Sequence, residues 1–167
     1  LPSFYSGGRR NPCPAGIMNG FRVTFPSDPT IWAHVRLMLR AVLEMYLIPG
    51  RECNLLTLGV DEAFTNIMRH AYEGRKDGAV ELNVTCRDKQ LSITLRDYGK
   101  KVPLEQKKSR DLSDIRPGGL GVHIIRSVFD EIQYDTSPPK GTILYLRKDL
   151  TKSIMEKQGL LGGKERK

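Results

Sequence analysis

Apolar and polar residues alternate in several short stretches of the chain, and each alternation predicts a β-strand with one buried face. In residues 21–25, Phe, Val and Phe alternate with Arg and Thr. Residues 80–87 and 91–96 alternate in the same way around a tight Asp-Lys turn and predict an antiparallel hairpin. A short strand at 133–135 and a last strand at 142–146 follow later in the chain.

Apolar side chains spaced three and four residues apart predict three amphipathic helices. The first spans residues 30–47, with Asp28 as its cap and Pro29 in the first turn. The second ends near 73–74, and the third opens at 118–121. The side chains expected to face the core are Ile31, Val35, Met38, Leu39, Val42 and Tyr46 in the first helix, Val60, Ala63, Phe64, Ile67 and Ala71 in the second, and Ile124, Ile125, Val128, Phe129 and Ile132 in the third.

The predicted order of elements is therefore β, α, α, ββ, α, ββ. This order is typical of an α/β (α+β) two-layer sandwich, in which one mixed, mostly antiparallel sheet carries three main helices on one face. We expect residues 21–150 to form this domain, between a flexible N-terminal arm at 1–20 and a basic C-terminal tail at 151–167. Residues 100–117 have few apolar anchors and are expected to form a flexible segment.

Length and composition limit the class of protein. At 167 residues and 39% hydrophobic content, the chain has enough apolar material for one core. It has no apolar run near the ~18 residues that a membrane span needs, and no apolar segment follows Arg9 and Arg10 as in a secretory signal. We therefore expect a soluble, cytoplasmic protein, with Met18 as a candidate natural start. The three cysteines have wide spacing and indicate neither a disulfide nor a zinc site.

The net charge of +8 raises the question of nucleic-acid binding. Most of this charge lies in three segments, since residues 1–20, 101–120 and 151–167 carry +2, +2 and +3. A folded basic groove would place the excess on the ordered strands and helices instead. We therefore expect no direct nucleic-acid partner.

The second predicted helix carries the first candidate for chemistry. Glu62 and Asn66 lie off its apolar stripe and are four residues apart, so they occupy the same side of the helix. A carboxylate and an amide oxygen so placed suit Mg²⁺ and a phosphate chain. Such a pair is also ordinary on the wet side of any helix, so the interpretation depends on the segments that follow.

Two glycine-bearing segments supply that support. Asp97 and Gly99 close the second hairpin strand, where a carboxylate can reach a ligand on the sheet. The segment 118–121, Gly-Gly-Leu-Gly, begins the third helix. Its glycines bring backbone N–H groups close to an anion, and the helix N-terminus adds a favourable field, so the β- and γ-phosphates of a nucleotide are expected here. The chain lacks a P-loop motif.

The ordered set Glu-x-x-x-Asn, Asp-x-Gly, Gly-Gly-Leu-Gly and a late Gly141-Thr142 resembles the motifs of the GHKL (histidine-kinase-like) ATPase superfamily. Within it, the chain is similar to the anti-sigma-factor serine/threonine kinases, from about Phe21 to Leu146. The resemblance implies a Bergerat-type ATP-binding fold, with ATP and Mg²⁺ as cofactors. It also places an ATP lid at 100–117, although the run Lys100-Lys101-Val102-Pro103 departs from the usual, less basic start of a lid.

The resemblance also implies a role for each motif residue. The Asp97 carboxylate would accept a hydrogen bond from the adenine amino group, Gly99 would leave room for the base, and the Thr142 hydroxyl would bond the base directly or through water. Asn66 would ligate Mg²⁺, and Glu62 would take the proton from the attacking hydroxyl. The residues expected to contact the phosphates are Gly119, Gly121 and Arg116.

The partners implied by the resemblance are a STAS-domain anti-anti-sigma protein as substrate, a sigma factor, and a second copy of the chain bound through the first strand and helix. Three other functions would also explain part of the sequence pattern. They are an ATP-gated binding module without catalysis, the catalytic domain of a two-component histidine kinase, and a basic nucleic-acid binder. The second needs a preceding helical hairpin with a phosphorylatable His, which the roughly 50 residues before Glu62 do not supply.

Overall fold

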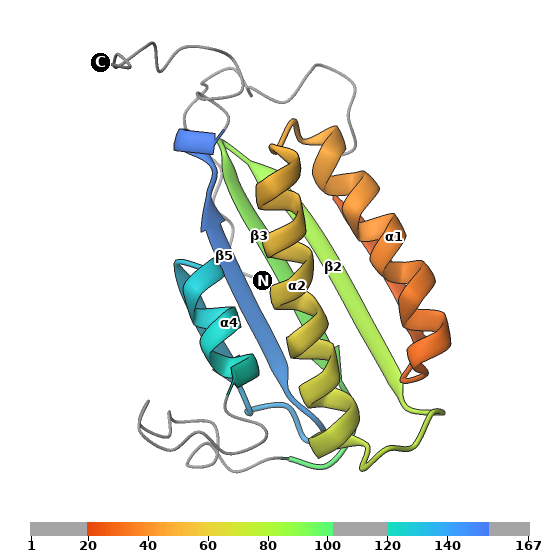
Figure 1. Ribbon diagram of the computed structural model, residues 1–167. Helices are drawn as coiled ribbons and strands as arrows, with labels where there is room; N and C mark the ends of the chain where they lie inside the picture. Colours follow the sequence, from red (N-terminus) through yellow and green to blue (C-terminus); the bar gives the residue numbers. More distant parts are fainter. Residues whose placement is uncertain (1–19, 102–119, 154–167) are drawn as a thin grey trace, which may run out of the picture.

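The computed structural model describes residues 20–101 and 120–153, which form one sheet with helices packed on one of its faces (Figure 1). The strands are β1 (Phe21–Pro26), β2 (Ala79–Arg87), β3 (Gln90–Asp97), β4 (Glu131–Asp135) and β5 (Ile143–Asp149). The helices are α1 (Pro29–Met45), α2 (Gly50–Asn66) and α4 (Leu120–Val128), and α2 continues directly into the π-helical turn η1 (Ile67–Ala71).

The strands lie in the order β1-β2-β3-β5-β4, and every pairing between these neighbours is antiparallel. The pairs β2–β3 and β4–β5 are consecutive in the chain. A tight turn at residues 88–89 joins the first pair, and residues 136–142 join the second. The predicted two-layer sandwich is confirmed. Where the prediction allowed a mixed sheet, the described strands contain no parallel pair.

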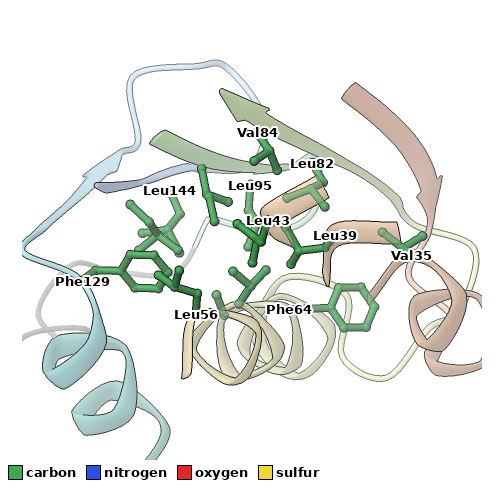
Figure 2. Packing of buried hydrophobic residues seen from close by; sticks show 14 of the residues in the cluster. Val35, Leu39, Leu43, Leu56, Phe64, Leu82, Val84, Leu95, Phe129 and Leu144 are labelled. Atoms are coloured by element: carbon green, nitrogen blue, oxygen red, sulfur yellow. The ribbon is translucent and has the colours of Figure 1, made fainter. Parts of the chain in front are cut away.

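The core lies between the sheet and the helices (Figure 2). Strand alternation directs every second side chain of β2 and β3 toward the helices, as predicted. The core side chains labelled in Figure 2 are Val35, Leu39, Leu43, Leu56, Phe64, Leu82, Val84, Leu95, Phe129 and Leu144. Full burial of each large side chain contributes about 1.5–3 kcal/mol relative to an exposed one.

Helix α1 is rotated relative to the predicted stripe. Ile31 and Met38 are 40% and 46% exposed, whereas Trp32 is buried. The Trp32 ring stacks on Phe64 with centroids 4.6 Å apart, and its indole N–H donates to Asp61 Oδ1 at 2.6 Å. Because these contacts direct the indole toward α2, the buried face turns toward Trp32 and away from Ile31. The predicted cap is confirmed, since the Asp28 side chain accepts from the N–H of Thr30.

The third helix is shorter than predicted. Helix α4 ends at Val128, and Ile132 belongs to β4, where it pairs with Leu146 of β5. The Asp130 N–H donates to the Arg147 carbonyl at 2.9 Å, which starts the chain along the edge of the sheet. Ile132 lies four residues after Val128 and so continues the helical spacing, which explains why the sequence pattern placed the boundary too late.

The predicted N-terminal arm, nearly all of the lid and most of the C-terminal tail lie outside the described residues. Within residues 20–101 and 120–153, no helix combines the length and apolar character needed to cross a membrane.

Candidate functional site

The Glu62 side chain reaches from α2 to the first turn of α4. It is half-buried, and a β-carbon added to Gly121 would lie 2.4 Å from its Oε2 atom. No side chain therefore fits at position 121 unless the carboxylate moves. The structure confirms that these two segments, nearly 60 residues apart in sequence, are neighbours.

A second glycine lets α2 and α4 approach each other (Figure 1). A β-carbon on Gly59 would lie 2.8 Å from the Phe129 ring and 3.6 Å from Val128. Gly59 lies one turn before Glu62 on the same side of α2. The small residue thus lets the C-terminal end of α4 pack closely on the helix that carries Glu62.

Asn66 is the last residue of α2, and the helix widens immediately after it. The Tyr72 N–H donates to the Ile67 carbonyl at 3.2 Å, which is a five-residue step. Such π-helical turns are rare and are frequent at functional sites. The wider turn buries the consecutive residues Ala71 and Tyr72, and it brings the helix end against the loop that follows β3.

Asp97 lies at the end of β3 with only 4% of its surface exposed. Its Oδ1 atom accepts from the Gly99 N–H at 3.0 Å, and its own N–H donates to the Thr142 carbonyl at 3.0 Å. A β-carbon on Gly141 would lie 2.8 Å from the same Oδ1, and Gly141 has a positive φ of 68°. The structure therefore brings Asp97, Gly99 and Thr142 together, as the motif pattern predicted.

The corner after Asp97 packs against the end of η1. A β-carbon on Gly99 would lie 2.3 Å from the Ala71 carbonyl oxygen, which also accepts from the Lys100 N–H at 2.9 Å. The Lys100 ammonium lies 2.8 Å from the Glu73 carboxylate. These contacts join the two halves of the site, because Glu62 and Asn66 belong to the same continuous helix that ends at Ala71.

Two of the predicted site residues, Arg116 and Gly119, lie outside the described residues. Tyr72 was not among the predicted site residues, although its ring is buried beside this corner. Burial raises the pKa of Tyr72 above its ordinary value of 10.0, and the Asp97 charge acts in the same direction. Among the residues with described positions, no group of three or more His, Cys, Asp or Glu side chains could hold a metal.

Comparison with known proteins supports the resemblance to the GHKL ATPase superfamily. The chain is 36% identical over 98 residues to an anti-sigma F factor of Bacillus licheniformis, covering 56% of this chain and 67% of that protein. It is 34% identical over the same length to the anti-sigma F factor of Bacillus subtilis. Part of the solved structure of the RsbU and RsbW domains of Rv1364c from Mycobacterium tuberculosis shares the fold, with a TM-score of 0.57 and 14% identity, over 78% of this chain and 32% of that one.

The family model for the histidine kinase-like ATPase domain matches residues 25–148. The match begins at the end of β1, and it includes the three described α-helices and the Glu62, Asp97 and Gly121 segments described above. The resemblance inferred from the four motifs is therefore confirmed, and this chain belongs to the histidine kinase-like ATPase domain family.

Proposed function

We propose that this chain is an ATP-dependent serine/threonine protein kinase of the anti-sigma-factor type. The observation that carries the proposal is the Glu62 carboxylate beside Gly121, which puts a proton acceptor at the N-terminus of α4. The anti-sigma F factors among its relatives support the choice within the family.

The nucleotide would lie along α2, with its base at the Asp97 corner and its phosphates at the start of α4. Asp97 would accept from the adenine amino group, since Gly99 N–H already orients its Oδ1 atom. Gly99 and Thr142 would border the base, because both contact Asp97 through the main chain. Gly119, Gly121 and Arg116 would contact the phosphates, where free N–H groups and the helix field favour anions.

Mg²⁺ would bind beside Asn66, a half-buried residue whose amide oxygen is a hard ligand one turn away from Glu62. When bound, the ion offsets the charge that builds as the γ-phosphoryl group leaves. Mg²⁺ usually completes its shell with waters and substrate phosphates, so a single protein amide is an adequate anchor.

Glu62 would act as general base in the transfer step. The substrate hydroxyl oxygen forms a bond to the γ-phosphorus, the bond from that phosphorus to the ADP oxygen breaks, and the hydroxyl proton passes to Glu62. Gly121 maintains the space in which the carboxylate must sit. A base within hydrogen-bond reach contributes about 10²- to 10⁴-fold to such a reaction.

The proposed partners are a STAS-domain anti-anti-sigma protein as substrate and a sigma factor held inactive, both in the cytoplasm.

A second copy of the chain would bind the exposed row of α1 formed by Ile31, Met38 and Met45, which are 40–49% exposed and seven residues apart. Sedimentation equilibrium tests the dimer. A monomer of wild-type protein at micromolar concentration, indistinguishable from Met38→Glu, would contradict it.

The kinase proposal is tested by Glu62→Gln with Glu52→Gln, on the same helix, as matched control. The substrate is a STAS-domain protein encoded by a neighbouring gene, with Mg-ATP labelled at the γ-phosphate. We expect phosphate transfer by Glu62→Gln to fall about 10²- to 10⁴-fold, while Mg-ATP affinity stays within a few-fold. Transfer at the native rate would show that Glu62 is not the base. Nucleotide-dependent partner binding without transfer by wild-type protein would favour the ATP-gated binding module.

A further inference from the structure

The Tyr72 hydroxyl connects three segments of the site. It donates to the Ala79 carbonyl at the start of β2 and accepts from the Tyr98 N–H at 2.9 Å. The Tyr98 N–H belongs to the peptide group directly after Asp97. The hydroxyl therefore fixes the backbone from which the Asp97 carboxylate projects.

The ring that carries this hydroxyl is held in place. Tyr72 is 6% exposed, and a β-carbon on Gly78 would lie 2.3 Å from the ring. The absence of a side chain at Gly78 therefore allows the ring to lie flat against the chain. The Tyr72 hydroxyl cannot move away from the Tyr98 N–H unless this close packing is disturbed.

The rest of the corner is held by main-chain contacts that a side-chain substitution does not remove. Ala71 accepts from the Lys100 N–H, and the Gly141 N–H donates to the Gly99 carbonyl at 3.1 Å. Loss of the Tyr72 hydroxyl would leave these contacts intact and would remove only its bonds to the Ala79 carbonyl and to the N–H of the Asp97–Tyr98 peptide. The expected consequence is a reoriented carboxylate in a protein that is still folded.

We propose that Tyr72 is a positioning residue that sets base selectivity by fixing the direction of the Asp97 carboxylate. This inference rests on the proposed function, in which Asp97 accepts from the adenine amino group. Guanine presents a carbonyl oxygen at the corresponding ring position, so a correctly aimed carboxylate favours adenine and repels guanine. Sites built around such hydrogen bonds discriminate strongly, and small misplacements reduce that discrimination.

The test compares Tyr72→Phe with Tyr98→Phe by calorimetric titration of Mg-ATP, Mg-GTP and Mg-triphosphate. Tyr98 is a matched control because its hydroxyl bonds Glu81 and not the Tyr72 corner, and its side chain is 39% exposed. We expect Tyr72→Phe to reduce the ratio of ATP to GTP affinity about tenfold, with triphosphate affinity unchanged. Tyr98→Phe should keep the wild-type ratio. An unchanged ratio in Tyr72→Phe would overturn the inference.

Further measurements separate this role from a general structural one. In an Asp97→Asn background, Tyr72→Phe should reduce the ratio no further, because the two residues act as one unit. A second reduction of equal size would overturn the inference. If Tyr72→Phe does not fold, amide hydrogen exchange in wild-type protein decides. The Tyr98 N–H should exchange slowly before nucleotide is added, and rapid exchange would overturn the inference.

The two proposals fail in different ways. If wild-type protein binds neither Mg-ATP nor Mg-GTP, the proposed function fails, and the role of Tyr72 fails with it. If wild-type protein prefers Mg-ATP and Tyr72→Phe keeps that preference, only the positioning role fails.

Discussion

At the scale of single residues, two glycines of the site serve different purposes. Gly141 needs both a positive φ of 68° and the absence of a side chain, because a β-carbon would lie 1.9 Å from the Asp97 carbonyl oxygen. Gly121 needs only the absence of a side chain, and the atom it would meet is the end of the Glu62 side chain. Substitution at Gly141 should therefore damage the fold, whereas substitution at Gly121 should damage the chemistry.

The variant Gly121→Ala tests this distinction. The added methyl group displaces the Glu62 carboxylate, so we expect phosphate transfer to fall about 10- to 100-fold, or about 1.4–2.7 kcal/mol in activation free energy. Alanine has the higher helix propensity, so the thermal midpoint should stay the same or rise. Transfer assays and thermal unfolding on the same preparations measure both effects.

Gly50→Ala is the matched control, since no atom lies within 4 Å of a β-carbon at that position. It should leave transfer unchanged. Equal activity of Gly121→Ala and Gly50→Ala would contradict the proposed contact between Glu62 and α4.

Glu62, Asn66 and Asp97 could be predicted as site residues because each belongs to a short motif with a recognisable spacing. The hydroxyl of Tyr72 was not among the predicted site residues. That hydroxyl acts on Tyr98, which is 26 residues away in the chain. The sequence around each of these two residues contains no pattern that predicts this contact. A role that depends on tertiary packing alone leaves no periodic signal.

At the scale of secondary-structure elements, periodicity predicted the order of strands and helices but not every face and boundary. At the start of α1 either Ile31 or Trp32 could face the core. Trp32 is the buried one because its ring stacks on Phe64 of α2. In α4 the helical spacing ran on to Ile132, and pairing with β5 ended the helix sooner. The π-helical turn after Asn66 had no sequence signal.

The junction between α4 and β4 gives a prediction about pH. Partial burial disfavours the Asp130 carboxylate, but the Asp149 N–H and the Lys148 ammonium, at 2.8 and 2.9 Å, outweigh it and lower its pKa below 3.8. Since the folded pKa is the lower one, the charge stabilises the fold above about pH 4, and this contribution disappears as the pH falls through the folded pKa.

Asp130→Asn should therefore destabilise the protein at pH 7, by at most about 1 kcal/mol because the pair is solvent-exposed. Urea unfolding of both proteins between pH 3 and pH 7 measures the difference in unfolding free energy. The difference should shrink below about pH 4. A difference that stays constant across this range would contradict the electrostatic explanation.

At the scale of the whole molecule, the fold brings the two halves of the site to one helix. In Figure 1 the end of α2 lies near the start of β5, at the bottom of the view. The Asp97 corner contacts the end of η1 through Ala71, and the start of α4 contacts Glu62 farther up the same helix. One continuous helix thus sets the spacing between the expected base and phosphate positions.

In this arrangement Asp97 should bind the base of ATP. Calorimetric titration of Mg-ATP into wild-type protein, Asp97→Asn and Asp88→Asn tests this interaction. Asp88 is a matched control, because it lies in the turn before the start of β3, whereas Asp97 lies at the end of that strand. Its substitution by Asn makes the same change in charge. We predict at least about tenfold weaker binding for Asp97→Asn and wild-type affinity for Asp88→Asn. Equal affinity of all three proteins, or no binding by wild-type protein, would contradict the account.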